Sequence, residues 1–151
     1  MRQINRIKDG LVNQKKSISF TFNGHILTGY EGDTLASALL ANNKKLVGRS
    51  FKYHRPRGIV TAGSEEPNAI MEIGNGPYKD PNTRATITEL YDGLEANSQN
   101  HKGPLGFDLM AIIDFLSPLV GAGFYYKTFM WPKAFWEKFY EPAIRNAAGL
   151  G

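Results

Sequence analysis

The pattern of residues 17–47 constrains the fold more than any other part of the chain. Apolar and polar residues alternate over residues 17–22, as in a strand with one buried face. Asn23-Gly24 then gives a strong hairpin signal, and the alternation resumes over residues 26–30. The sequence therefore predicts a two-stranded antiparallel hairpin.

A helix is predicted to follow this hairpin. Asp33 or Thr34 can accept hydrogen bonds from the first N–H groups, and residues 35–39 carry an apolar stripe at i, i+3 and i+4. The helix is expected to end near residue 42, ahead of a return strand over residues 46–47. This order opens a β-grasp arrangement, in which a mixed sheet curls around one helix, and the predicted fold class is α+β.

The remaining chain completes the predicted organisation. Further strands are expected over residues 69–73 and 85–90, joined by a turn-rich loop whose Gly, Pro and Asn residues break regular structure. After Leu94 a polar bridge is expected. The predicted domains are an N-terminal arm (1–16), a β-grasp domain (17–95) and a helical, aromatic-rich extension (96–151).

The extension is expected to hold two helices. One spans residues 108–119, and the other begins near Pro132, in a segment dense in aromatic residues. The segment from Phe124 to Tyr140, with Ile144, offers more large apolar surface than one small β-grasp core covers, so we expect a docking arm. In the alternative interpretation, the two helices form a self-contained second layer.

The chain contains no cysteine. Disulfides, thiolate nucleophiles, zinc ribbons and iron-sulfur ligation by thiolates are thereby excluded. The plant-type ferredoxin spacing C-x4-C-x2-C falls on Thr61, Glu66 and Ala69, in a long loop directly before the strand predicted over residues 69–73. The sequence therefore predicts a loop of cluster-binding spacing without a cluster, and no metal site.

A basic run precedes that loop. The net charge is +4, and no acidic residue lies between Asp33 and Glu65. Such a run is typical of a solvated face, of a site for phosphates, or of a surface facing an acidic partner. The candidate anion or interface contacts are Arg49, Lys52, His54, Arg55 and Arg57. Nucleic-acid binding is not expected, because the rest of the chain is balanced in charge and has no nucleic-acid-binding motif.

Catalytic motifs are missing from the sequence. The three histidines lie in separate segments without HExxH or GxSxG patterns, and Gly74-Asn75-Gly76 is too short for a dinucleotide fingerprint. Glu65-Glu66, followed by Pro67, is interpreted as a loop element, so no catalytic residue is assigned. No signal peptide or apolar run of about 18 residues occurs. We expect a cytoplasmic protein without membrane association.

Several segments of the sequence resemble those of a known family. EGDTLASALLAN, LVGRSFKYHRPRG, PNTRAT and GFYYKTFMWPKAFWEKFYEP are similar to the N-terminal region of the α subunit of heterotetrameric sarcosine oxidases, over residues 17–151. In cysteine-bearing relatives this region resembles a ferredoxin-like domain with a [2Fe-2S] cluster. The ligand positions then fall on Thr61, Glu66 and Ala69, so the resemblance implies a vacated site.

The resemblance also implies a function for the assembly. These enzymes oxidatively demethylate sarcosine to glycine with FAD and FMN, and NAD is also bound. The chain ends at Gly151 before any G-x-G-x-x-G, so we expect a fragment or split gene product that is not catalytic alone and carries no cofactor. Its expected partners are the remainder of the α subunit and the other subunits. The alternative is an independent anion- or nucleic-acid-binding module using residues 44–57.

Overall fold

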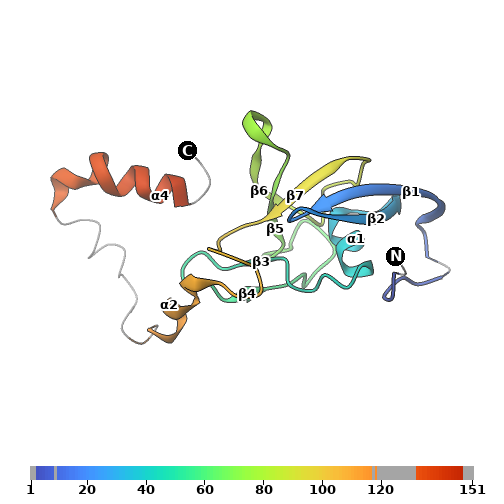
Figure 1. Ribbon diagram of the computed structural model, residues 1–151, viewed down its shortest axis with the longest axis horizontal. Helices are drawn as coiled ribbons and strands as arrows, with labels where there is room; N and C mark the ends of the chain where they lie inside the picture. Colours follow the sequence, from blue (N-terminus) through green and yellow to red (C-terminus); the bar gives the residue numbers. More distant parts are fainter. Residues whose placement is uncertain (1–2, 9, 117, 119–131, 148–151) are drawn as a thin grey trace.

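The computed structural model describes residues 3–8, 10–116, 118 and 132–147. At its centre lies a five-stranded mixed sheet with strand order β2-β1-β7-β5-β6, and the helix α1 packs against it (Figure 1). The strands of this sheet are β1 (Asn13–Phe22), β2 (His25–Glu31), β5 (Ile70–Ile73), β6 (Asp80–Arg84) and β7 (Leu94–Ser98). A mixed sheet with a packed helix confirms the predicted α+β class.

The predicted hairpin is confirmed. β1 and β2 are antiparallel, with Phe20 opposite Leu27. Both turn residues adopt positive φ, 49° at Asn23 and 77° at Gly24, as the tight turn between two twisted strands requires. The first strand begins at Asn13, within the segment predicted as an N-terminal arm, and its register is irregular before Ser17.

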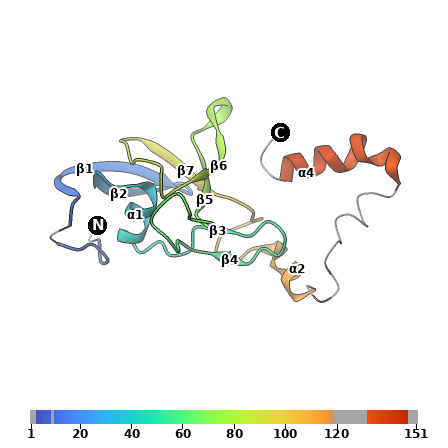
Figure 2. The same ribbon diagram turned by 180° about the vertical axis from the view of Figure 1, so that it is seen from behind.

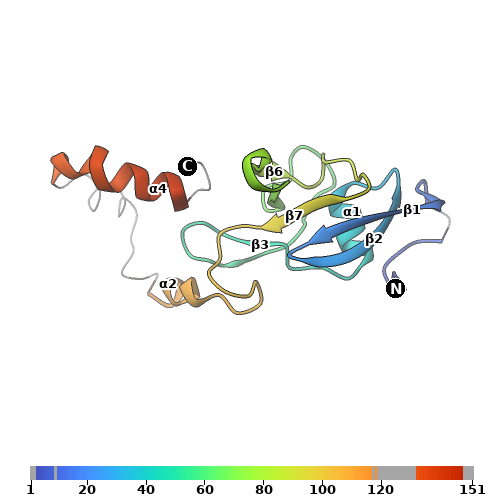
Figure 3. The ribbon, with the colours of Figure 1, turned by 45° about the horizontal axis from the view of Figure 1, so that its top comes forward.

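The predicted helix is also confirmed as α1 (Leu35–Ala41). Thr34 caps it: the Thr34 Oγ1 accepts from the Ser37 N–H at 3.2 Å, and the Ser37 Oγ accepts from the Thr34 N–H at 3.0 Å. Leu35 and Leu39 are fully buried. Figure 3 shows the helix beneath the sheet formed by β1, β2 and β7. The cap at Thr34 therefore sets where α1 begins, and the apolar stripe sets which face of the helix is buried.

The central strand β7 was not predicted. It lies parallel to β1, with Phe20 opposite Leu94, and antiparallel to β5. Leu94, Ala96 and Ser98 are buried on one face, but small and polar residues make this alternation weak in the sequence. The sheet therefore continues through Ser98, past the predicted domain boundary at residue 95.

Residues 85–90 do not form the predicted strand. β6 ends at Arg84, inside what was predicted to be a loop after residue 73, and that loop also contains the short helix η1 (Gly76–Tyr78). The chain then turns, with the Thr88 hydroxyl donating to the Arg84 carbonyl at 2.9 Å. Because the Thr88 side chain makes a local hydrogen bond to the backbone, the alternating pattern forms a turn here and not a paired strand.

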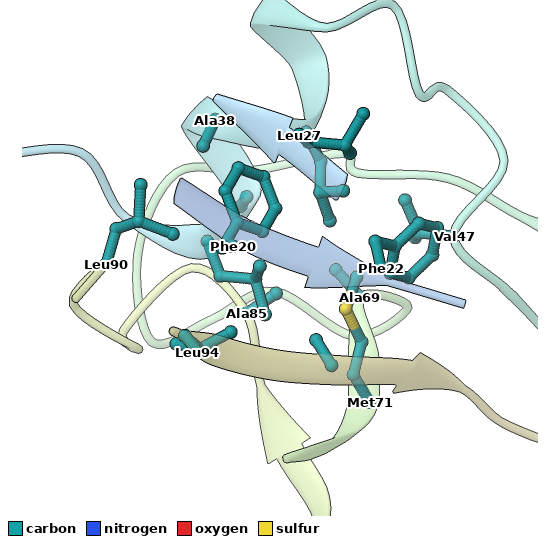
Figure 4. Close-up of a cluster of buried hydrophobic side chains, with 14 of the residues drawn as sticks. Phe20, Phe22, Leu27, Ala38, Val47, Ala69, Met71, Ala85, Leu90 and Leu94 are labelled. Carbon is teal, nitrogen blue, oxygen red and sulfur yellow. The ribbon is translucent and has the colours of Figure 1, made fainter. Parts of the chain in front are cut away.

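The return strand lies two residues later than predicted. β3 (Gly48–Arg49) pairs with β4 (Pro56–Arg57) in a separate two-stranded sheet. Val47, directly before β3, is fully buried in the main core. Figure 4 shows side chains from the sheet, α1 and the loops meeting in this core. Its largest fully buried apolar members are Phe20, Leu35, Leu39, Met71, Leu94 and Val47.

Gly29 provides a test of this packing. A Cβ added at Gly29 would overlap the Leu90 Cδ2 and lie 3.2 Å from the Ala38 Cβ. We expect Gly29→Ala to lower the free energy of unfolding by about 1–3 kcal/mol, the usual cost of overpacking, in urea denaturation. Gly106→Ala is the control, because no atom lies within 4 Å of its added Cβ. Equal stabilities of the two variants would contradict this packing.

Helical pieces follow the sheet domain. Of the predicted helix over residues 108–119, the described residues include η2 (Leu109–Ala111) and α2 (Ile112–Phe115). After Pro132 come η4 (Lys133–Phe135), the π-helical turn η5 (Trp136–Tyr140) and α4 (Glu141–Ala147). Residues 124–131 of the predicted docking arm lie outside the described residues. None of the described helices is long and apolar enough to cross a membrane.

Three aromatic side chains of the predicted arm are partly exposed. Phe135, Trp136 and Phe139 are 46%, 41% and 60% exposed. The rings of Phe135 and Phe139 meet edge to face, with centroids 5.2 Å apart. Figure 2 shows the α4 segment apart from the strands of the sheet. In this structure the aromatic face is not covered by the described part of the sheet domain.

Candidate functional site

The loop between β4 and β5 closes around one carboxylate. Glu66 is fully buried. Its Oε2 accepts the backbone N–H groups of Val60 at 2.8 Å and Thr61 at 2.5 Å. Its Oε1 accepts those of Asn68 at 2.8 Å and Ala69 at 3.2 Å. Both oxygen atoms are therefore held by main-chain donors from the two ends of the loop.

These bonds keep the carboxylate ionised. Burial by itself raises the pKa of Glu66, because a charged group loses its hydration. The backbone N–H groups of Thr61, Asn68, Val60 and Ala69 outweigh burial and lower the pKa to about 2. A hydrogen bond from the Thr61 hydroxyl, at 3.2 Å, adds a fifth donor. Glu66 is thus an anion at every ordinary pH.

The loop is anchored from outside by the turn that follows β6. The Arg84 Nε donates to the Glu66 carbonyl at 2.8 Å, and the Thr86 hydroxyl donates to the Gly63 carbonyl at 2.7 Å. The Ala85 N–H donates to the Ala69 carbonyl at 2.9 Å. The end of β6 at Arg84 and the turn at residues 85–86, which was predicted as the start of a strand, therefore hold the loop in place.

A [2Fe-2S] cluster does not fit the residues of this loop. At the three positions with ligand spacing, Thr61 offers a hydroxyl already bonded to Glu66, and Ala69 offers only a methyl group. The Glu66 carboxylate is committed to four N–H groups. Among the described residues no group of three His, Cys, Asp or Glu side chains is placed to hold a metal. The loop thus keeps the ligand spacing but not the ligand chemistry.

Arg49, a predicted anion contact, is turned inward. Its side chain donates to the carbonyls of Leu105 at 3.1 and 3.0 Å, His54 at 2.9 Å and Gly106 at 3.3 Å. Only 9% of the residue is exposed. The guanidinium therefore ties β3 and the loop after it to residues 105–106.

His54 joins the same cluster through Asp108. The His54 Nδ1 lies 2.7 Å from the Asp108 Oδ2, and the Arg49 Nε lies 4.0 Å from that oxygen. Burial raises the pKa of Asp108, but the N–H groups of Lys102 and Met110, with His54, outweigh this and lower it. Asp108 was not among the site residues predicted from the sequence, although its position directly before an apolar helical segment is a capping signal.

The other predicted contacts lie around Tyr53. The Lys52 Nζ and the Arg55 guanidinium lie 4.8 and 4.7 Å from the Tyr53 ring centroid. The Arg55 Nε also donates to Asp114 at 2.7 Å. Arg57 pairs through its backbone with Gly48. The structure therefore brings Arg49 and His54 together at Asp108 and places Lys52 and Arg55 beside the ring of Tyr53. The role of the five residues in binding an anion stays a prediction.

A cavity of about 600 Å³ lies beside the turn that joins β1 to β2. Lys44, His25 and His101 contribute basic groups to its wall. The Ser98 Oγ lies 2.8 Å from the His101 Nε2, and the His101 Nδ1 lies 2.7 Å from the Gly103 carbonyl. The described residues that line the cavity include no Asp or Glu. Lys44 is the only Lys or Arg among the described residues that line the cavity, and it is the only basic residue of the predicted run that reaches it.

The strand order, the helix α1 packed against the sheet and the loop before β5 define a [2Fe-2S] ferredoxin-type domain without its cluster ligands. Residues 15–101 match the model of a family described as "2Fe-2S iron-sulfur cluster binding domain", and the chain belongs to this family. The match continues past residue 95, in agreement with the place of β7.

Relatives of known name extend this comparison. The chain is 65% identical over 144 residues to "Sarcosine oxidase subunit alpha" of Rhizobium meliloti (strain 1021), covering 95% of this chain and 15% of the relative. It is 39% identical over 97 residues to the protein of the same name from Corynebacterium sp. (strain U-96), covering 62% of this chain and 10% of the relative. The resemblance seen in the sequence is confirmed, and the chain spans a small part of these relatives' length.

One solved structure is also similar. The "Crystal structure of L-proline dehydrogenase from P.horikoshii" has a TM-score of 0.46 and 28% sequence identity, covering 56% of this chain and 16% of that chain.

Proposed function

We propose that this chain serves as a structural and assembly domain in the N-terminal part of a sarcosine oxidase alpha subunit, in an enzyme that oxidatively demethylates sarcosine to glycine. The observation that carries the proposal is the loop closed on Glu66, since an electron-transfer domain would need ligands there. A domain that keeps this fold but performs no redox chemistry can still act through its surfaces, by binding other parts of the enzyme.

The lack of cluster ligands also bears on where the cofactors of the enzyme bind. In this proposal FAD, FMN and NAD bind to other parts of the assembly, and this chain carries none of them. Its identity of 65% to an alpha subunit, over 95% of the chain, supports a place in that subunit. Arg49 and His54 then stabilise the domain, whereas Lys52, Arg55 and Arg57 are candidates for contacts with an acidic neighbouring surface.

The surface that we assign to docking is the aromatic face of η4 and η5. Phe135, Trp136 and Phe139 expose rings that the described sheet domain does not cover. Aromatic side chains are enriched in the buried centres of protein interfaces. The proposed occupant is the remainder of the alpha subunit, because the curated relatives carry most of their length outside the matched region.

A pull-down tests the proposed function. The tagged chain is co-expressed with the remainder of the alpha subunit and the other subunits, and release of hydrogen peroxide from sarcosine is measured. We expect co-purification and activity only with the full set, and no activity from this chain with added FAD and FMN. The Phe135→Ala, Trp136→Ala and Phe139→Ala triple variant should weaken capture at least 10-fold, as expected for lost interface anchors.

The matched control is Tyr78→Ala, which removes an aromatic ring 87% exposed at another place on the domain. It should leave capture unchanged. Equal capture of the triple variant and the wild type would contradict docking through this face. Tight, salt-sensitive binding of a random oligonucleotide by the wild type, without subunit capture, would favour the alternative of a nucleic-acid-binding module.

A further inference from the structure

Four backbone N–H groups of one loop converge on a single anion. The donors belong to Val60, Thr61, Asn68 and Ala69, and all four lie within 3.2 Å of the Glu66 carboxylate. Converging main-chain N–H groups form concave anion sites, known as nests, which proteins use for phosphates and for iron-sulfur centres. The loop backbone therefore has the geometry of an anion receptor.

No side-chain cation neutralises this anion in the described part of the chain. None of the ion pairs among these residues includes Glu66. Arg84 approaches the residue, but its Nε donates to the Glu66 carbonyl. Glu65, the adjacent carboxylate, is exposed. The negative charge is stabilised by main-chain dipoles and one hydroxyl, and the buried donors would lack partners if the carboxylate were removed.

We propose that residues 60–69 form an anion-binding nest that supplies its own ligand, the Glu66 carboxylate, in the electrostatic role that a cluster has in cysteine-bearing loops. The nest explains how the loop keeps an ordered conformation with neither thiolates nor iron. It also defines the ligand class that the loop accepts when the side chain is shortened. That class is a small monocarboxylate, because Glu66→Ala removes a group of the size of acetate.

Chemical rescue tests the nest directly. Glu66→Ala is titrated with sodium formate and sodium acetate, with sodium chloride at equal ionic strength, and the backbone amides are followed by ¹H–¹⁵N NMR. We expect saturable, downfield movement of the amide protons of Val60, Thr61, Asn68 and Ala69, because they regain a charged acceptor. The midpoint temperature of thermal unfolding of Glu66→Ala should rise by several degrees with formate or acetate and should not rise with chloride.

Glu65→Ala is the matched control, since it removes the neighbouring exposed carboxylate and leaves the nest filled. Its amides at the four positions should not respond to formate. A wild-type measurement covers the case in which Glu66→Ala does not fold: the same four amides should move upfield together as pH falls toward 2. Absence of a formate response in folded Glu66→Ala would overturn the proposal, as would wild-type amides that do not move together.

Discussion

Replacing Asp108 by alanine is expected to lower the free energy of unfolding by about 3 kcal/mol, because the change opens a buried charge cluster. The N–H groups of Lys102 and Met110 lose their acceptor, and His54 loses its carboxylate partner. Arg49 keeps its carbonyl acceptors but loses the nearby negative charge. Urea denaturation followed by circular dichroism measures the loss.

Asp114→Ala is the control for this change. Asp114 also pairs with a basic residue of the same run, Arg55, at 2.7 Å, but both side chains are about half exposed. Exposed pairs contribute less than about 1 kcal/mol. Equal effects of the two alanine variants would mean that the buried cluster does not join residues 48–57 to residues 102–110, and would return Arg49 and His54 to the list of candidate ligand contacts.

The second large effect is a loss of stability in acid that comes from Glu66. Its pKa is about 2 in the folded protein, against 4.5 for an unperturbed glutamate. Because the folded pKa is the lower one, the stabilisation is fully present above about pH 5 and disappears as pH falls toward 2. The difference corresponds to about 3 kcal/mol at most.

The comparison variant is Glu66→Gln, which has nearly the same shape but no charge. At pH 7 it should be less stable than the wild type by about 3 kcal/mol, and this gap should close as pH falls from 5 to 2. Asp33 and Asp108, whose pKa values are also lowered, contribute to acid unfolding in both proteins and therefore cancel in the difference. A gap that stays constant over this range would assign the loss to other carboxylates.

The local elements of this fold were predictable from the sequence. Asn23-Gly24 specifies the hairpin because its backbone adopts positive φ at both positions. Thr34 and Ser37 specify the start of α1 through bonds between residues three apart. The lack of cysteine alone predicted that a loop with cluster-binding spacing holds no thiolate-ligated cluster. In each case the deciding contacts are local or are matters of composition.

Only the tertiary structure decided the role of each charged residue. Arg49 was predicted as a candidate anion or interface contact, and only the structure shows that its donors bond the carbonyl of His54 and those of Leu105 and Gly106, more than fifty residues away in the chain. Glu66 was interpreted as a loop element, and its burial against four N–H groups appears only once the loop has closed. β7 was missed because small residues stabilise it through pairing with β1 and β5. Sequence patterns record local preference, whereas burial and pairing depend on which distant segments meet.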